Sequence, residues 1–141
     1  MINHLLEKRG LNYKHVVVEP GERGESNHKD NIYKNKELFK DNYTIIAKFA
    51  EDLNVNDLKT LDYHPDCLYV DCEGCLHNFF NTDIGKYCLK STRFIVNEND
   101  SFVIGKDIQE LRDLFTKSDF SKIGVGYGCG TDCETEIWYK N

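Results

Sequence analysis

Four short apolar runs limit the folds open to this chain, because each is flanked by polar residues and none is long. They lie at residues 15–18, 44–46, 67–70 and 94–96. Short runs rich in β-branched and aromatic side chains favour strands, and unbroken apolar runs suit a sheet covered on both faces. The sequence therefore predicts a sheet built from short strands.

Helical patterns alternate with these runs. Residues 2–9 have apolar positions at helical spacing and stop at Gly10, and residues 79–91 carry a looser pattern of the same kind. The clearest helix is predicted over 106–118, where Asp107 can cap the start and Glu110 follows three residues later as in a capping box. Residues 21–34 read as a polar surface loop, and 34–42 as a solvated helix.

The last part of the chain is different, because two apolar runs are separated only by a glycine-rich stretch. This pattern, over residues 120–141, is typical of an antiparallel hairpin. Strands that alternate with helices and end in a hairpin predict a single α/β domain over 1–141. Its sheet is expected to be mostly parallel with an antiparallel edge.

Charge and composition exclude several classes of function. The net charge is −6, from 18 basic and 24 acidic residues mixed along the chain, so no basic face for nucleic acid is evident. No apolar stretch approaches the length of about 20 residues that a membrane span needs, and none resembles a secretion signal. A cytoplasmic protein is expected, in which the six cysteines are free thiols or metal ligands.

Acidic residues follow three of the predicted strands. Glu19 ends the first, Asp71 and Glu73 follow the third, and Glu98 and Asp100 follow the fourth. If Val18, Val70 and Val96 belong to neighbouring parallel strands, these acids converge on the edge where α/β sheets bind ligands. Each acid could also serve only as a turn or capping residue.

The order of these motifs resembles the C-terminal two-thirds of an FkbM-type methyltransferase domain. The resemblance spans residues 12–141 and is most specific at D-x-E-G, residues 71–74, preceded by a strand that ends in Glu19-Pro20. It implies a Rossmann-like class I fold, S-adenosylmethionine as cofactor and methyl transfer to a hydroxyl oxygen. It also implies Glu19 as the ligand of the cofactor ribose, with Asp71 and Glu73 at the reaction centre, where they orient the substrate, accept its proton or hold a divalent cation.

The chain departs from that family at two places. Leu76 stands where the family usually has a second glutamate. The first strand of the fold and its glycine-rich loop would lie before residue 1, so the domain is expected to be truncated, and to be inactive alone or completed by a partner chain. The glycines at 124–128 are interpreted as a hairpin turn rather than this loop, because too few residues follow them to form a helix.

The cysteines support an alternative of another class, a non-catalytic binding module. Two closely spaced pairs have the spacing of a structural zinc site: Cys72 with Cys75, and Cys129 with Cys133. A thioredoxin-like redox role fits the first pair less well, because glutamate and glycine separate the thiols. His77 beside it could be a ligand or a general base, whereas Cys67 and Cys88 are expected in the core.

Overall fold

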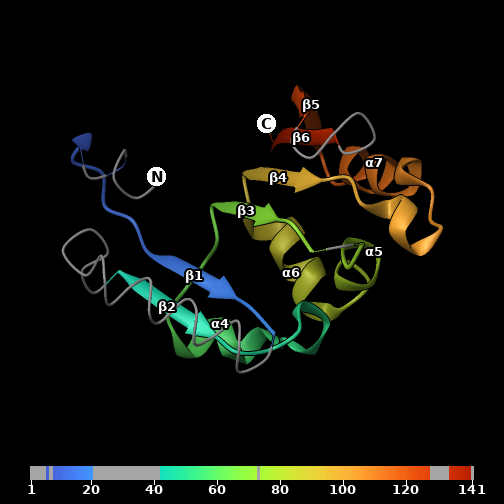
Figure 1. The fold of residues 1–141 in the computed structure, drawn as a ribbon. Helices are drawn as coiled ribbons and strands as arrows, with labels where there is room; N and C mark the ends of the chain where they lie inside the picture. The colour runs from blue at the N-terminus through green and yellow to red at the C-terminus, as the bar shows by residue number, and fades with distance from the viewer. Residues whose placement is uncertain (1–5, 7, 21–41, 73, 128–133, 141) are drawn as a thin grey trace. The chain divides into compact units, whose positions relative to one another are not determined.

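The structure, a computed structural model, describes residues 6, 8–20, 42–72, 74–127 and 134–140 (Figure 1). The chain divides into two compact units, Met1–Asp52 and Leu53–Asn141, and each is considered by itself. No helix within the described ranges is both long enough and apolar enough to cross a membrane.

The first unit contains a two-stranded parallel sheet. Strands β1 (His15–Val18) and β2 (Tyr43–Ile46) pair in a register that sets Val18 beside Ile46. A 3₁₀ turn, η1 (Ala50–Asp52), follows. The two predicted strands are confirmed, and Gly10 has the left-handed conformation (φ 65°) that its position after an apolar helical pattern predicts. The predicted loop at 21–34 and the helix at 34–42 fall almost wholly outside the described residues.

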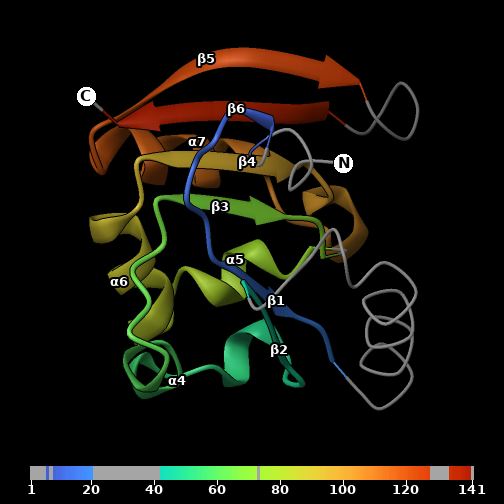
Figure 2. The same cartoon turned by 90° about the vertical axis from the view of Figure 1, so that its left-hand side faces the viewer.

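The second unit contains a four-stranded mixed sheet in the order β3-β4-β6-β5 (Figure 2). Strands β3 (Cys67–Val70) and β4 (Phe94–Glu98) are parallel neighbours. The hairpin is formed by β5 (Phe120–Tyr127) and β6 (Glu134–Lys140), as the sequence predicts.

The placement of the hairpin corrects the expected topology. Its second strand pairs antiparallel with β4, so β6 lies inside the sheet and β5 at its edge. The sheet of this unit is therefore mixed rather than mostly parallel. Burial accounts for the order, since β6 contributes Trp138 to the core whereas β5 carries two glycines that have no side chain to bury.

Among its described residues, the second unit also has four helices and a 3₁₀ turn. They are α4 (Val55–Thr60), α5 (Leu76–Phe79), α6 (Asp83–Ser91), η2 (Ser101–Ile104) and α7 (Ile108–Lys117). The local signals that start them are visible: Asn54 and Asp57 form a capping box at α4, and the Thr82 hydroxyl accepts a hydrogen bond from the backbone N–H of Gly85 at α6. Asp107 caps α7 by accepting from the N–H of Gln109.

The core of this unit lies between the sheet and α7. The Phe115 ring of α7 makes edge contacts with the rings of Trp138 and Phe80, each at 5.2 Å between centroids. Ile95 of β4 is completely buried on the same face. On the opposite face Tyr69, at 58% exposed, and Ile137, at 37%, are open to solvent. One face of this sheet therefore carries the core.

Candidate functional site

Three carboxylates gather where β3 and β4 end. The register sets Val70, the last residue of β3, beside Asn97, so Asp71 directly after β3 comes next to Glu98, the last residue of β4. One carboxylate oxygen from each of Asp71, Glu98 and Asp100 lies within 4.8 Å of the others. This convergence agrees with the prediction for two of the three strand ends, because acids after neighbouring parallel strands meet at one edge.

The three acids differ in exposure, which affects what they could do. Asp71 is exposed, Glu98 is half-buried and Asp100 is buried. Burial, together with the negative charges of Glu98 and Asp71, raises the pKa of the nearby Tyr69 hydroxyl. Carboxylate oxygens at this separation could hold a divalent cation, or accept a proton from a hydroxyl group placed between them.

The turn that carries Asp71 packs closely on the segment after β4. Gly74 has a positive φ of 90°, and a Cβ there would lie 2.9 Å from Cγ2 of Ile104 and 3.3 Å from the backbone oxygen of Asp100. Only glycine fits such an approach without displacing its neighbours. The resemblance to D-x-E-G thus coincides with a physical requirement at Gly74, while Glu73 lies outside the described residues.

A disulfide closes the same turn and corrects the view of the cysteines. Cys72 and Cys75 are bonded to each other, with their Cα atoms 5.4 Å apart. Since both sulfur atoms take part in the disulfide, neither is a free thiolate that could bind zinc, and the predicted four-cysteine zinc site is not supported. The other two cysteines of that site, Cys129 and Cys133, lie outside the described residues. The expectation that every cysteine is a free thiol or a metal ligand is wrong for this pair.

The two remaining described cysteines differ from each other. Cys88 on α6 is buried, as predicted, whereas Cys67 at the start of β3 is exposed, so the prediction of a core position is wrong for it. Cys67 lies on the sheet face that the core does not use, beside Phe94 in the register.

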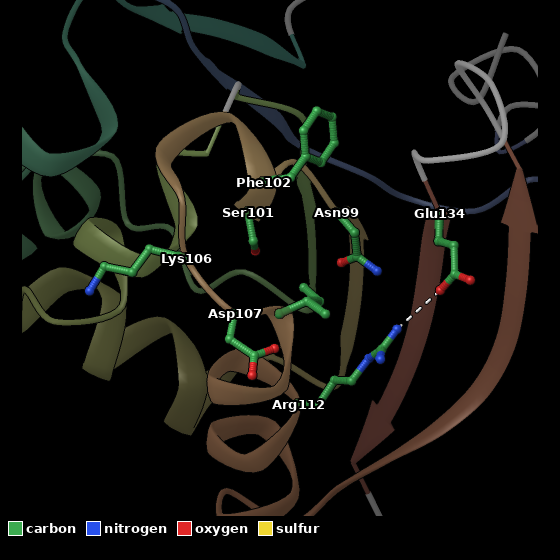
Figure 3. Close-up of a pocket in the computed structure, with 8 residues that line it drawn as sticks. Asn99, Ser101, Phe102, Lys106, Asp107, Arg112 and Glu134 are labelled. Atoms are coloured by element: carbon green, nitrogen blue, oxygen red, sulfur yellow. Dashed lines mark hydrogen bonds and ion pairs between the residues drawn. The ribbon is translucent and has the colours of Figure 1, made fainter.

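A cavity of about 380 Å³ opens beside the carboxylates, among the segment after β4, the first turns of α7 and the start of β6 (Figure 3). Asn99, Ser101, Phe102, Lys106, Arg112 and Glu134 are among the residues that line it. Asn99 and Ser101 are buried, whereas the Phe102 ring is 60% exposed. The cavity thus combines polar groups in its wall with an aromatic ring open to solvent.

An ion-pair network fixes one wall of this cavity. Arg112 donates from Nε to Glu136 at 2.8 Å and from Nη2 to Glu134 at 3.0 Å. Glu136 is completely buried and also accepts from Lys122 Nζ and Trp138 Nε1, each at 3.1 Å. Burial raises the pKa of Glu136, but the hydrogen bonds from Arg112 and Lys122 outweigh this and lower it overall. Glu136 therefore remains ionised and holds Arg112 in place.

His77 contacts two other elements. Its Nε2 is 3.0 Å from Oγ of Ser101, and its Nδ1 is 3.6 Å from a carboxylate oxygen of Glu110. The sequence predicts a capping box between Asp107 and Glu110, but only the Asp107 half is found, because Asp107 accepts from the N–H of Gln109 while the Glu110 carboxylate faces His77. Burial lowers the pKa of His77, partly offset by Glu110.

Glu19 follows β1 in the first unit. Its backbone N–H donates to the carbonyl of Ile46 at 3.1 Å, which continues the pairing of β1 and β2 beyond the strands. Val18 pairs with Ile46, whereas Tyr69 and Val70 pair with Val96 and Asn97. The convergence of Glu19 with Asp71 stays a prediction, because the two residues belong to different units.

Sequence reasoning missed several polar residues of this region. Ser101, Arg112 and Glu134 belong to no motif, and they come together only because α7 packs across the start of β6. Asn97 did leave a signal, since an amide within a short apolar strand is unusual for a residue that favours turns.

Comparison with solved structures identifies the fold. Sp1610 of Streptococcus pneumoniae, whose proposed activity is tRNA (m1A22) methylation, was solved with S-adenosyl-L-methionine. It matches 96% of this chain and 59% of its own with a TM-score of 0.66 at 12% identity. This chain has the fold of the class I methyltransferases. An O-methyltransferase from Bacillus cereus, solved with SAH, matches 94% of this chain and 66% of its own, with a TM-score of 0.62 at 20% identity.

Fibrillarin of Methanococcus jannaschii, a pre-rRNA processing protein, is a third structural relative. It matches 89% of this chain and 55% of its own, with a TM-score of 0.62 at 12% identity. The chain thus spans between about half and two-thirds of the length of these structures. No protein-family model and no curated protein matches the sequence. At such low identity the likeness establishes the Rossmann-like fold, and the activities named belong to the relatives.

Proposed function

We propose that this protein is an S-adenosylmethionine-dependent O-methyltransferase of FkbM type. The observation that carries the proposal is the cluster of Asp71, Glu98 and Asp100 at the carboxyl ends of β3 and β4, in a chain with the class I fold. In α/β sheets this edge is where ligands bind. Two of the relatives were solved with the methyl donor or its product, which supports the same cofactor here.

Glu19 is the proposed ligand of the cofactor ribose. It stands directly after a parallel strand, and a carboxylate can accept hydrogen bonds from two vicinal hydroxyl groups at once. S-adenosylmethionine supplies an activated methyl group when bound. The methionine part would be held by residues other than those described, from this protein or from a partner chain.

The carboxylate cluster is the proposed reaction centre. Asp71 is exposed and can reach a hydroxyl of the acceptor, while the buried Asp100 and the half-buried Glu98 lie next to it. Asp71 accepts the hydroxyl proton as the oxygen takes the methyl group, and Glu73 acts with it in this proposal. A divalent cation held by the three carboxylates would lower the pKa of that hydroxyl instead.

Calorimetric titration of the full chain with S-adenosylmethionine tests the proposal. We expect saturable binding that Glu19→Gln weakens by about 10- to 100-fold, the value of a hydrogen bond to a charged group. Asp71→Asn should leave this affinity within about twofold, since Asp71 is assigned to the acceptor, and Glu51→Gln, an exposed acid of η1, is the matched control.

Two results would count against this proposal. Absence of binding at millimolar cofactor removes methyl transfer by the isolated chain, and equal affinity of wild type and Glu19→Gln removes the ribose assignment. Titration with Mg²⁺ separates the two roles of the cluster, because a cation site predicts binding that Asp71→Asn abolishes.

A further inference from the structure

Three side chains outside the proposed methyl-transfer centre are arranged in series. Ser101 of η2, His77 of α5 and Glu110 of α7 come from three different elements. The hydroxyl Oγ of Ser101 lies 3.0 Å from Nε2 of His77, and Nδ1 of the same ring lies 3.6 Å from a carboxylate oxygen of Glu110. Hydroxyl, imidazole and carboxylate in this order form the arrangement by which enzymes activate a serine.

The serine also faces a space that could hold a substrate. Ser101 lines the 380 Å³ cavity (Figure 3), whereas His77 is 6% exposed and is not among the residues that line it. A reacting group in the cavity could therefore meet the hydroxyl, while the imidazole stays shielded from bulk water.

The same cavity contains an unused hydrogen-bond donor. Asn99 lines it and is 7% exposed, and its Nδ2 has no hydrogen-bond partner among the described residues, although its Oδ1 accepts from Asn97 at 2.6 Å. A buried donor without a partner is costly, so it indicates a group that arrives with the ligand. An oxygen that becomes negative during a reaction is such a group.

The imidazole is in the state that a general base requires. Burial lowers the pKa of His77, and the positive charge of Lys106 lowers it further, whereas Glu110 and Asp107 raise it. The ring is therefore neutral near pH 7. Glu110 beside Nδ1 favours the tautomer with its proton on that nitrogen, which leaves Nε2 free to accept from Ser101.

We propose that Ser101 is a catalytic nucleophile that hydrolyses a small carboxylic ester bound in this cavity, with His77 as general base and Glu110 as positioning residue. This activity goes beyond the proposed methyl transfer. Ser101 Oγ forms a bond to the carbonyl carbon as its proton passes to His77 Nε2. The bond to the alcohol oxygen then breaks, and that oxygen takes the proton from His77.

Water completes the cycle. A water molecule gives a proton to His77 as its oxygen bonds to the acyl carbon, the bond from Oγ to that carbon breaks, and Oγ takes the proton back. The carboxylic acid and the alcohol leave, and the protein returns to its starting state. The Asn99 amide donates to the negative oxygen of both tetrahedral intermediates.

Covalent labelling of the wild-type chain gives the first test. The full chain, with its disulfide intact, is incubated with a biotin-tagged fluorophosphonate, and the adduct is mapped by peptide mass spectrometry. We expect one adduct, on Ser101, formed with loss of fluoride. No adduct, or an adduct confined to other residues, overturns the proposal without depending on whether any variant folds.

Hydrolysis of p-nitrophenyl acetate gives the second test. Ser101→Ala should abolish the catalysed rate, and His77→Gln should reduce it by about 10²- to 10⁴-fold, the range for a general base. The control is Ser91→Ala, whose hydroxyl donates to the Tyr87 carbonyl on α6 and does not line the cavity. Equal rates in wild type and His77→Gln overturn the proposal.

The positioning role of Glu110 has a separate readout. In NMR titration of the His77 ring, Glu110→Gln should lower the pKa of His77 further, since the carboxylate raises it, while Lys106, Asp107 and Ser101 stay unchanged around the ring. The same variant should hydrolyse the ester more slowly than wild type. An unchanged ring pKa together with an unchanged rate removes Glu110 from the proposal.

Discussion

Arg112 and Glu136 form an ion pair whose acidic member is completely buried. Nη2 of Arg112 lies 2.7 Å from Oε1 of Glu136, and the two residues join α7 to the inner strand β6. A buried carboxylate is tolerated only when its partners satisfy it, and here Lys122 and Trp138 supply the rest. The pair therefore ties the helix that covers the core to the sheet.

Removal of Arg112 should destabilise the protein strongly. Arg112→Met leaves Glu136 buried with fewer partners, and we expect a loss of about 3 kcal/mol in the free energy of unfolding, measured with urea. Arg93→Met is the matched control, since Arg93 is exposed and donates to the Tyr139 hydroxyl at 3.2 Å, so its loss should be within about 1 kcal/mol. Similar losses for the two variants would show that the buried pair does not stabilise the fold.

The same carboxylate predicts how stability depends on pH. The hydrogen bonds from Arg112 and Lys122 hold the pKa of Glu136 below its ordinary value of 4.5, against the effect of burial. As pH falls below 4.5, the carboxylate of Glu136 is protonated in the unfolded chain before it is protonated in the folded protein. The stability that Glu136 contributes therefore decreases until the pH reaches the lower pKa of the folded state. Urea unfolding from pH 7 to pH 3 should show that the difference in the free energy of unfolding between wild type and Glu136→Gln becomes smaller. A difference that stays constant over this range would contradict the lowered pKa of Glu136.

Gly85 should tolerate no side chain. A Cβ at this position, in the first turn of α6, would lie 2.1 Å from the backbone oxygen of Phe79 and 2.6 Å from Cα of Phe80. We expect Gly85→Ala to cost about 3 kcal/mol, because backbone would have to move. Gly126→Ala is the control, since nothing lies within 4 Å of a Cβ there. Thermal unfolding measures both, and equal melting temperatures would mean that α5 and α6 can separate at little cost.

The two free cysteines among the described residues should react at different rates. Burial raises the pKa of Cys88 to about 11, whereas Cys67 is exposed, although burial of its thiol and Asp66 raise its pKa too. With iodoacetamide at pH 8, peptide mass mapping should find Cys67 modified first and Cys88 only after unfolding. Without a reductant, Cys72 and Cys75 should stay unmodified, and their alkylation would show that the disulfide is not present in solution.

The strands and helix α7 could be predicted because their signals are local, whereas the short helix α4 was not predicted. Valines and isoleucines in short runs placed β1 to β4, and Asp107 with its apolar stripe placed α7. The convergence of Asp71 with Glu98 and Asp100 also followed, because it needs only that β3 and β4 be parallel neighbours.

The rest of the site depends on packing between distant segments. Glu136 contacts Arg112 because β6 lies beside β4, and the sequence around neither residue predicts this position of β6. The contact of His77 with Ser101 joins residues 24 positions apart. The disulfide was missed for another reason, since the spacing of Cys72 and Cys75 fits a zinc ligand pair equally well.

The strand order has a consequence for how this protein is made. Residues 134–140 are synthesised after β4 and β5, yet they occupy an inner position between these two strands. Until they emerge, β4 and β5 have no partner between them, and the pocket for Trp138 among the aromatic rings is empty. The second unit should therefore complete its folding only after residues 134–140 have left the ribosome, and a nascent chain stalled before these residues emerge would expose its core to chaperones and proteases.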